Sequence, residues 1–171
     1  SAALCDAAGN DRGTWSERVV RGADGVLLPA VAALLETLTG EGATLRAVAV
    51  ATGPGGFTGL RVGVATALGL AFARQVPVVP VSSLAARAQL VQAPRVLSLL
   101  DARKGKVYAG LYDTRGSEPV LLSPEVDVPL ETLLPCPDTV AVGEGAARFA
   151  DALTAAGLRL AHDPAQGAAL A

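Results

Sequence analysis

The chain has 171 residues, enough for one large domain or for two small lobes that share an interface. Hydrophobic residues make up 51% of it and aromatic residues only 4%, so the core must be built from Ala, Val and Leu. The formal net charge is −2 and the only lysines are Lys104 and Lys106, which argues against a basic face that binds nucleic acid by itself.

Composition also limits the cellular compartment and the redox chemistry. Cys5 and Cys136 lie far apart and form no C-x-x-C pair, which favours two reduced thiols over a metal or redox site. No apolar run reaches the ~20 residues of a membrane-spanning helix. No basic segment followed by an apolar one indicates a secretory signal. The sequence therefore predicts a cytoplasmic protein without a membrane partner.

The first elements read as a hairpin, a helix and a strand. A strand from about Ala3, a turn at 10–13 and a second strand over 14–21 predict an antiparallel hairpin. Apolar residues at helical spacing predict an amphipathic helix over 27–38 that ends near Gly40. Residues 47–51 form a short apolar run, which predicts a buried strand.

A glycine-rich loop at 52–56 follows that strand, and the chain must turn sharply there. Thr58 stands where the N-cap of the next helix, 58–75, would lie. A strand, a glycine loop and a helix start together form a common anion-binding geometry. The alternative is a structural turn whose glycines serve positive φ and tight packing, and chemistry alone favours neither. The candidate anion-binding residues of this stretch are Gly53, Gly55, Gly56, Thr58 and Arg61.

The rest of the chain predicts the end of a first lobe, 1–93, and a second lobe, 94–171. Strand 76–81 and helix 84–92 complete the first lobe, and Pro94 breaks the pattern. The second lobe holds strand 96–101, a tight turn at 103–105, strand 106–112, an edge strand at 120–128 interrupted by Pro124, strand 140–142, and a helix that ends at Gly157.

The stretch from Gly53 to Gly63, GPGGFTGLRVG, closely resembles the G-P-G-S-F-T-G-x-R-x-G signature of the TsaB (YeaZ) family. The match continues in register with LLP at 27–29, VSSL at 81–84 and DAR at 101–103, and it covers roughly residues 3–160. The resemblance implies an α/β fold of the actin-like and Hsp70-like ATPase type (ribonuclease H-like) with two lobes. The order of the expected elements is compatible with that fold.

The fold that the resemblance implies has a central first strand, which carries an Asp near its end. This sequence starts at what would be the second strand. A sheet without its central strand leaves backbone N–H and C=O groups unpaired, at about 1–3 kcal/mol each. We therefore expect an upstream strand of about 5–10 residues with an apolar run that leads to an Asp. The resemblance also implies a last helix and a tail after Ala171, which this sequence does not include.

The function that the resemblance implies is that of a non-catalytic dimerisation subunit. TsaB proteins pair with the transferase TsaD, and TsaE joins the assembled complex, to make threonylcarbamoyladenosine beside the anticodon of tRNA. By itself the chain is expected to form a homodimer, to bind no cofactor and to contact tRNA only through the complex. ATP or ADP is expected only in the assembled complex.

The expected interface lies on the two helices that flank the glycine loop, because TsaB proteins pair through them. Within helix 58–73, small residues recur every four positions, and we expect this stripe to face the partner while Leu60, Val64, Leu68 and Phe72 pack on the sheet. The alternative is that the small stripe packs within its own chain. The expected interface residues are Leu27, Leu28, Val31, Leu35, Gly59, Gly63, Ala67 and Ala71.

The metal site of the sister family TsaD is an H-x-x-x-H pair after the strand that follows the glycine loop. The matching positions here are Ser83 and Arg87, and serine is a poor ligand while a guanidinium repels a cation. The one histidine, His162, falls in an expected loop. We therefore expect no metal site and no catalysis by this chain alone.

Asp101 and Glu144 are the remaining acidic candidates. Asp101 ends an apolar strand, where it could hold a magnesium-bound water beside a nucleotide, or could cap the turn at 103–105, which we favour. The alternative function is a nucleotide-binding phosphotransferase or a peptidase-like enzyme. A peptidase needs a metal or a base-activated nucleophile, and one histidine offers neither.

Overall fold

The computed structural model describes residues 1–17, 23–40, 42–134 and 136–162, which fall into two compact units. The first unit holds Ser1–Ala51 and Phe57–Pro80. The second holds Thr52–Gly56 and the described residues from Val81 to His162. The units therefore divide at 80/81, not at the expected 93/94.

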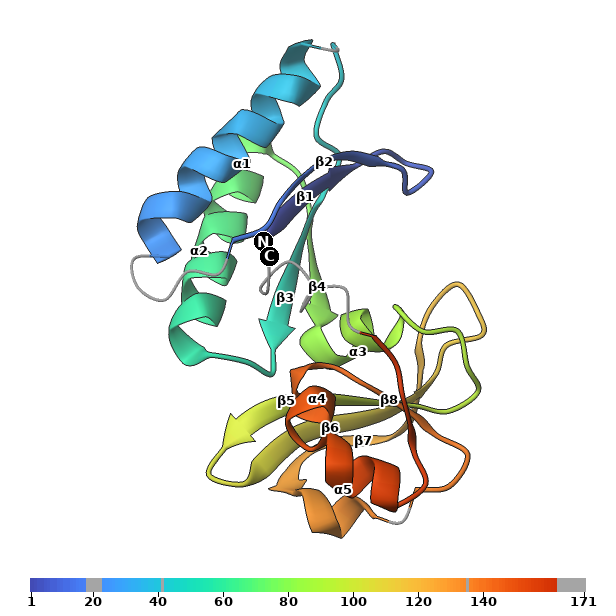
Figure 1. The fold of residues 1–171 in the computed structure, drawn as a ribbon. Helices are drawn as coiled ribbons and strands as arrows, with labels where there is room; N and C mark the ends of the chain where they lie inside the picture. Colours follow the sequence, from blue (N-terminus) through green and yellow to red (C-terminus); the bar gives the residue numbers. More distant parts are fainter. Residues whose placement is uncertain (18–22, 41, 135, 163–171) are drawn as a thin grey trace. The chain divides into compact units, whose positions relative to one another are not determined.

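The first unit combines two helices with two two-stranded sheets (Figure 1). Helices α1 and α2 contact each other, and α1 also contacts β1 and β2. In the part of the chain that the structure describes, no helix is both long and apolar enough to cross a membrane. The elements are β1 (Ala2–Cys5), β2 (Asp11–Trp15), α1 (Ala23–Gly40), β3 (Val48–Gly53), α2 (Phe57–Arg74) and β4 (Val78–Ser82).

The expected hairpin is present, but its second strand lies earlier than the sequence predicted. β1 and β2 pair antiparallel, with Ala2 opposite Trp15. The Asp6 carboxylate accepts hydrogen bonds from the N–H groups of Ala8 and Asn10, so the chain reverses at 6–10 instead of 10–13. Side-chain and backbone hydrogen bonds from Asn10 hold the pKa of Asp6 below its usual value. The prediction for 18–21 lies outside the described residues.

The second unit is built around a five-stranded mixed sheet of order β7-β6-β5-β8-β9, so the chain is an α/β protein. β5, β6 and β7 pair antiparallel, while β8 is parallel to β5 and to β9. The elements are α3 (Ser83–Ala88), β5 (Val96–Arg103), β6 (Lys106–Asp113), β7 (Val120–Pro129), a 3₁₀ turn (Leu130–Leu133), β8 (Val140–Val142), α4 (Glu144–Arg148), α5 (Ala150–Ala155) and β9 (Arg159–Leu160).

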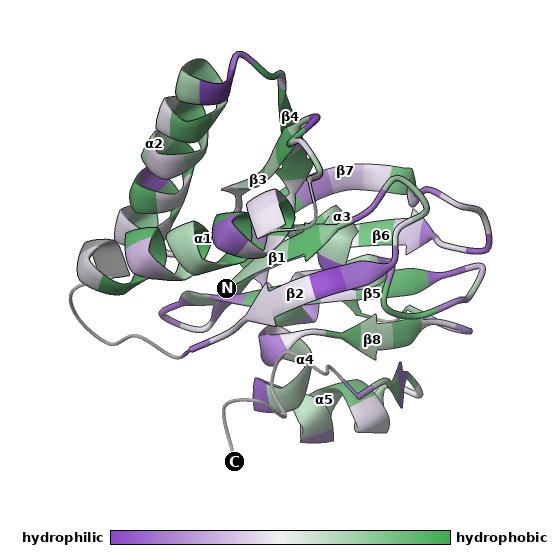
Figure 2. Cartoon of the chain, turned by 90° about the horizontal axis from the view of Figure 1, so that it is seen from above, coloured by the Kyte–Doolittle hydropathy of each residue, from purple (hydrophilic) through white to green (hydrophobic). Residues whose placement is uncertain are grey.

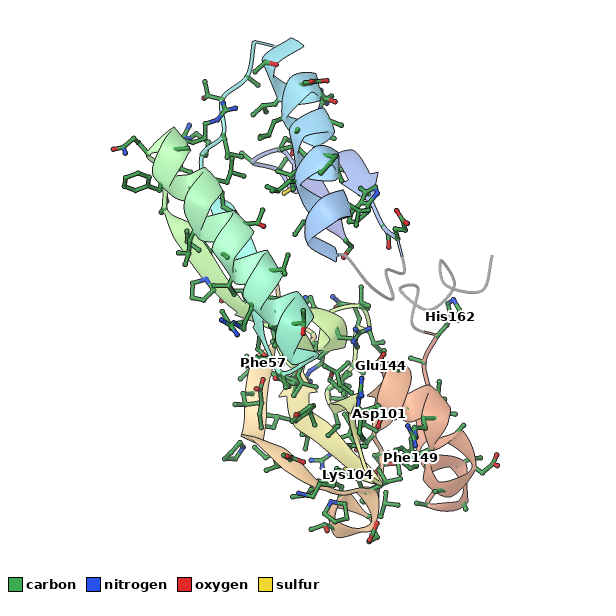
Figure 3. All side chains as sticks on the ribbon, turned by 90° about the vertical axis from the view of Figure 1, so that its left-hand side faces the viewer. Phe57, Asp101, Lys104, Glu144, Phe149 and His162 are labelled. Carbon is green, nitrogen blue, oxygen red and sulfur yellow. The ribbon has the colours of Figure 1, made fainter. Side chains whose placement is uncertain are left out.

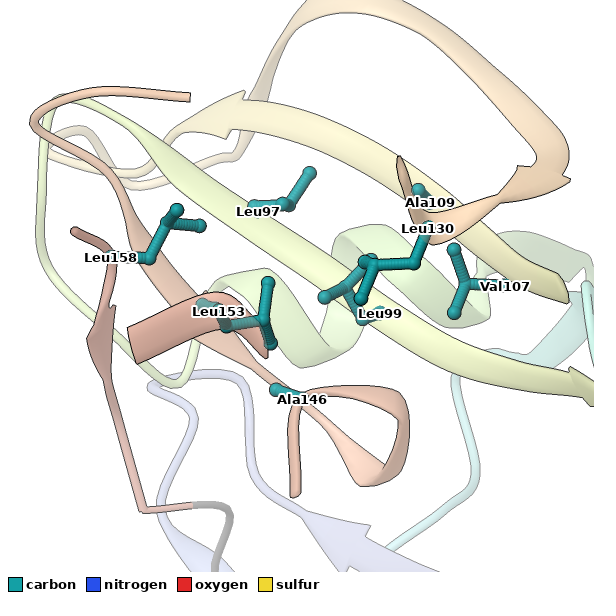
Figure 4. Packing of buried hydrophobic residues seen from close by; sticks show 9 residues of the cluster. Leu97, Leu99, Val107, Ala109, Leu130, Ala146, Leu153 and Leu158 are labelled. Carbon is teal, nitrogen blue, oxygen red and sulfur yellow. The ribbon is translucent and has the colours of Figure 1, made fainter. Parts of the chain in front are cut away.

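Strand β5 lies at the centre of this unit and is buried on both faces. Leu97 and Leu99 belong to a core cluster with Leu153 of α5 (Figure 4). Val96 and Leu100 belong to a second cluster, on the α3 side. Figure 2 shows β5 and β8 in the green of hydrophobic residues, whereas β2 carries a hydrophilic stretch. Burial on both faces explains why apolar residues of this strand do not simply alternate with polar ones.

Helix α3 belongs to the second unit, which corrects the expected lobe boundary. It ends at Ala88, where the sequence predicted a helix to residue 92. Leu84 and Ala88 are fully buried and pack with Val96 and Leu100 of β5. Burying these side chains against the second sheet fixes α3 there, although Pro94 suggested a boundary further on.

The expected last helix is divided into α4 and α5 at Phe149. Phe149 has φ −111° and ψ 27°, outside helical geometry, so the chain bends between the two short helices. Leu153 of α5 then reaches the core cluster of β5. The short strand β9, which the sequence did not predict, pairs with β8 through Val140 and Arg159.

Candidate functional site

The glycine loop lies between β3 and α2, as the sequence predicted. Gly53 has φ +113°, a backbone conformation that residues with a side chain rarely adopt. The backbone therefore requires glycine at this position of the loop. Gly55 and Gly56 are exposed. The Thr52 hydroxyl donates to the carbonyl oxygen of Val81 at 3.3 Å, which ties the start of the loop to the end of β4.

Thr58 is not the N-cap of the loop helix, because α2 already begins at Phe57. The N-cap position falls one residue before Phe57, on Gly56, and Thr58 lies inside the first turn. A glycine at that position leaves the first N–H groups without a side-chain cap. The anion-site prediction rested on these uncapped N–H groups, which lie at the end of the loop and the start of α2. Anion binding there stays a prediction.

Arg61 interacts with an aromatic ring of its own helix. Its guanidinium carbon lies 5.2 Å from the centre of the Phe57 ring, a cation–π distance. The sequence made Arg61 a candidate anion-binding residue, although a cation is disfavoured at a helix start. Figure 3 shows Phe57 at the beginning of α2. The attraction between the guanidinium and the Phe57 ring offsets part of the unfavourable interaction of a cation with the helix start.

Asp101 caps the turn after β5, which confirms the favoured alternative. One carboxylate oxygen accepts the N–H of Arg103 at 2.8 Å, and the other accepts a hydrogen bond from the Arg148 guanidinium at 2.5 Å. Lys104 and Gly105 complete a two-residue turn with φ +52° and +79°, and Asp101 and Lys104 are labelled in Figure 3. With both oxygens engaged, Asp101 is a structural residue in this conformation.

The other polar candidates are not brought together into a catalytic set. Glu144 is exposed at the first position of α4, and His162 is exposed outside any helix or strand. Ser83 begins α3 and Arg87 lies in its last turn. Among the described residues, no group of three or more His, Cys, Asp or Glu side chains could hold a metal ion. The absence of a metal and of catalysis stays a prediction.

An apolar groove runs between α1 and α2 and encloses about 460 Å³. Leu28, Val31 and Leu35 of α1 form one wall, and Ala65 and Gly69 of α2 lie in the other. A second hollow of about 320 Å³ lies along α2. It is lined by Leu60, Arg61, Val64, Ala65 and Leu68.

Large apolar side chains beside these hollows are exposed to solvent. Leu28 is 59% exposed and Leu68 53%, and Phe72 reaches 81%. Leu28 lines the hollow between the helices and Leu68 lines the hollow along α2. Exposed apolar side chains at such hollows are typical of a protein–protein interface. The two helices therefore carry a candidate docking surface that combines both hollows with the exposed Phe72 of α2. We call this surface the α1–α2 groove and define it by Leu28, Val31, Leu35, Leu60, Val64, Ala65, Leu68, Gly69 and Phe72.

The expected faces of α2 were wrong. Ala67 and Ala71 are buried within the first unit, at 6% and 3% exposure, whereas Leu68 and Phe72 point outward. Gly59 and Gly63 line a different cavity, next to β3. Ala67 and Ala71 thus pack within their own chain, whereas a Cβ atom added at Gly59 or Gly63 would meet no atom within 4 Å. Of the eight expected interface residues, four line the inner cavity and Ala71 is buried, while Leu28 and Leu35 line the groove and Val31 lines both. The four cavity residues are Leu27, Gly59, Gly63 and Ala67.

The reason for this error is that α2 is apolar all round. Both stripes, Gly59-Gly63-Ala67-Ala71 and Leu60-Val64-Leu68-Phe72, satisfy the spacing of a buried helix face. Small residues let a helix approach strands closely, so the small stripe can be the inner one. One feature of the sequence could have indicated that Leu68 and Phe72 point outward. Helix α2 contains more apolar residues than one buried stripe needs.

Comparisons with known proteins agree with the signature in the glycine loop. A sequence model of the family described as "TsaD: tRNA N6-adenosine threonylcarbamoyltransferase" matches residues 13–161. The chain is 50% identical over 66 residues to the tRNA threonylcarbamoyladenosine biosynthesis protein TsaB of Haemophilus influenzae, which covers 36% of this chain and 28% of that protein. It is 40% identical over 90 residues to the Escherichia coli protein of the same name, which covers 50% and 39%.

A solved structure is similar as well. YeaZ from Pseudomonas aeruginosa superposes with a TM-score of 0.68 at 35% identity, over 79% of this chain and 66% of that chain. The chain spans 28–39% of the length of the two curated relatives and 66% of the length of YeaZ.

Proposed function

Because the chain belongs to the TsaD family, and within it to the TsaB (YeaZ) group, we propose that it is a non-catalytic subunit that organises a transferase in the threonylcarbamoylation of tRNA adenosine. The observation that carries this proposal is the α1–α2 groove, an apolar surface on the helices that flank the family signature. The relatives' names place them in the biosynthesis of threonylcarbamoyladenosine in tRNA. For the complete protein we propose the two-lobed actin-like (ribonuclease H-like) fold.

The proposed partner is TsaD, the catalytic sister subunit. Two helices of each subunit would pack across the boundary as a helical bundle, with side chains such as Leu28 and Leu68 buried between them. Burial of an exposed leucine contributes about 1.5–3 kcal/mol, so a few such residues can dominate the affinity. In the absence of TsaD, the same apolar surface would pair two copies of this chain.

The proposed division of labour leaves the chemistry and the RNA contact to the partners. Ser83 and Arg87 occupy the positions that the resemblance assigns to the metal-binding pair of TsaD, which supports a subunit without its own metal. The net charge of −2 supports tRNA contact through the complex rather than through this chain. TsaE and ATP or ADP would join only the assembled complex, and the proposed location is the cytoplasm.

The test is a charge placed in the groove, compared with a matched charge elsewhere. Leu68→Glu should abolish co-elution with TsaD in gel filtration and reduce tRNA modification in a reconstituted system by more than about 100-fold, because a buried unpaired carboxylate costs several kcal/mol. Leu90→Glu is the control, because Leu90 is equally exposed (51%, against 53% for Leu68) and lies in the second unit.

Three outcomes distinguish the proposed interface subunit from a chain with another interface and from an enzyme. Loss of association with Leu68→Glu but not with Leu90→Glu supports the proposed interface. Full association and modification by Leu68→Glu, with an unchanged circular dichroism spectrum, would contradict it. ATP turnover or peptide hydrolysis by the isolated chain would instead indicate an enzyme.

A further inference from the structure

The hairpin of β5 and β6 carries the densest group of cations in the sequence (Figure 1). Arg103, Lys104 and Lys106 fall within four consecutive positions, and they include both lysines of the chain. All three are exposed, as is Gly105 between them. We call this group the basic tip and define it by Arg103, Lys104 and Lys106. It lies within the second unit of a chain whose formal net charge is −2.

The geometry of the turn does not account for these cations. Arg103 has φ +67° and Lys104 has φ +52°, both in the left-handed region that residues with a side chain rarely adopt. A two-residue hairpin turn with this backbone favours Asn-Gly, and here Lys104 takes the place of the asparagine. The tip therefore keeps cations at two positions where the backbone favours Gly or Asn. Strain retained in this way is characteristic of functional sites.

The charges of Arg103 and Lys104 are available to a ligand. Within the described residues, neither side chain forms an ion pair or a hydrogen bond. Lys106 lies 3.8 Å from Asp127, and both side chains are half exposed, so this ion pair is weak and can be exchanged for another. A ligand with several negative charges could therefore engage all three cations at once.

The tip is also held in place before any ligand binds. The Asp101 carboxylate accepts the N–H of Arg103 at 2.8 Å and a hydrogen bond from Arg148 at 2.5 Å. Val107, directly after the tip, is fully buried in the core cluster of β5. Cations on a fixed turn lose less conformational entropy on binding than cations on a loose loop.

The composition of the tip favours a phosphate backbone over other polyanionic surfaces. Its four residues, Arg103–Lys106, include no apolar side chain that could enter a bilayer, which argues against a membrane surface. Arg and Lys side chains contact the phosphates of nucleic acids, and such contacts need no pocket. The proposed function also brings one polyanion, tRNA, to the assembled complex.

We propose that the basic tip contacts the phosphate backbone of the tRNA that the assembled complex modifies. This inference rests on the proposed function and deepens it. The partner supplies the main RNA contact, because this chain as a whole is acidic, and the tip adds about two or three phosphate contacts to it. Such contacts do not depend on the RNA sequence, so the tip positions the tRNA and does not select it.

The first test needs only this chain. Unmodified tRNA is added at low salt to the isotope-labelled 171-residue protein, and the backbone amide resonances are followed by NMR. The resonances of residues 103–106 should shift as tRNA is added, and about 0.3 M salt should reverse the shifts. The amides of β9 (Arg159–Leu160) are the internal control and should not shift. Shifts that avoid the tip, or no shifts at all, would overturn the proposal.

The second test uses a double variant that removes charge from the tip and relieves the turn. Arg103→Gly with Lys104→Asn supplies residues that the left-handed backbone favours, and it keeps the N–H that Asp101 accepts. The urea midpoint of this tip variant should therefore be higher than that of the unchanged chain. A lower midpoint would show that the two cations serve the turn itself, and it would overturn the proposal.

The tip variant is then assembled with TsaD, and its binding to tRNA is measured at several salt concentrations. The Kd for tRNA at about 0.1 M salt should rise about tenfold or more, and the slope of log K against log salt should become shallower by about 1.5, because two phosphate contacts are lost. In the modification reaction, the KM for tRNA should rise with kcat unchanged, since a phosphate contact binds ground state and transition state equally.

Arg115→Gln with Arg159→Gln is the matched control, because it also removes two exposed cations of the second unit. Arg115 lies beyond the other end of β6, and Arg159 lies in β9, at the opposite edge of the sheet from β7. The tRNA affinity of this control should stay within about twofold of the unchanged complex. An equal loss of affinity in the two double variants would indicate a general effect of net charge and would overturn the proposal.

Other partners of the tip predict other results. Displacement of tRNA from the tip by polyglutamate or by phosphatidylglycerol vesicles, at equal charge concentration, would assign the tip to an acidic protein or to a membrane and would overturn the proposal. Failure of the proposed function gives a different result, because the chain and TsaD would then not co-elute. In that case the NMR titration of the isolated chain still decides whether the tip contacts RNA.

Discussion

The hydroxyl of Tyr112 donates a hydrogen bond to the carboxylate of Glu125, which joins β6 to the edge strand β7. The Ser82 hydroxyl donates to the same carboxylate oxygen at 2.5 Å, and Ser82 also accepts the N–H groups of Leu84 and Ala85 as the N-cap of α3. Burial and the hydrogen bond to Glu125 raise the pKa of Tyr112 above its usual value. One carboxylate thus connects β7, β6 and the start of α3.

Removal of this acceptor should destabilise the second unit. Glu125→Ala deprives two hydroxyls of their partner and should cost about 1–3 kcal/mol, while Tyr112→Phe should cost about 1 kcal/mol. The double variant should lose less free energy of unfolding than the sum of the two single losses, because both substitutions break the same hydrogen bond between Tyr112 and Glu125. Urea denaturation measures all three. Glu118→Ala, on an exposed segment before β7, should stay within about 0.5 kcal/mol. Strict additivity would show that Tyr112 and Glu125 are not coupled.

The Asp113–Arg115 pair should affect stability only in acid. Both carboxylate oxygens of Asp113 accept hydrogen bonds from the Arg115 guanidinium, and these bonds lower the pKa of Asp113 to about 2. Because the folded pKa is below the unfolded one, the stabilisation is complete above the unfolded value of about 4 and is lost as the pH falls from there to about 2. The effect on stability should be small, since the pair is exposed to solvent.

The measurement for this pair is an NMR titration of the Asp113 carboxyl. Arg115→Gln should return the pKa of Asp113 towards its usual value. Lys106→Gln, which removes the 3.8 Å ion pair of Lys106 with Asp127, should leave the Asp113 titration unchanged. An unchanged Asp113 pKa in Arg115→Gln would refute the assigned cause.

Gly143 should not tolerate a side chain. It has φ +109°, and a Cβ atom there would lie 2.2 Å from the carbonyl oxygen of Leu99. Backbone strain and overlap with a central strand should make Gly143→Ala destabilising by about 2–4 kcal/mol. Gly116→Ala is the control, because its nearest contact would be an ordinary 3.7 Å. Thermal unfolding of the two variants compares them directly, and equal midpoints would contradict the close approach of Gly143 to β5.

Asp101→Asn should affect the turn and leave the proposed function intact. Asn can still accept the N–H of Arg103, but the ion pair with Arg148 is lost, which should cost about 1 kcal/mol or less because Arg148 is half exposed. Association with TsaD and tRNA modification should be unchanged. A more than tenfold loss of modification, in a variant that remains folded and associated, would instead support the nucleotide-binding role of Asp101.

Much of the local structure could be predicted from the sequence. The glycines and the proline at 52–56 placed the turn between β3 and α2, and the helical spacing of leucines placed α1. The alternation around Val107 placed β6, and Pro124 marked β7 as an edge strand. These predictions succeeded because a single residue type, or a period of 2 or 3.6, encodes each feature within a few neighbouring positions.

The sequence by itself determined the signature, the identity of the two flanking helices and the substitutions at Ser83 and Arg87. Only the tertiary structure decided which face of α2 is buried, where α3 belongs and what Asp101 binds. The physical reason is that these depend on distant partners: the strands beside Ala67, the core around Leu84, and Arg148, which lies 47 residues from Asp101. When a helix is apolar on every side, its own sequence does not indicate which side its neighbours bury.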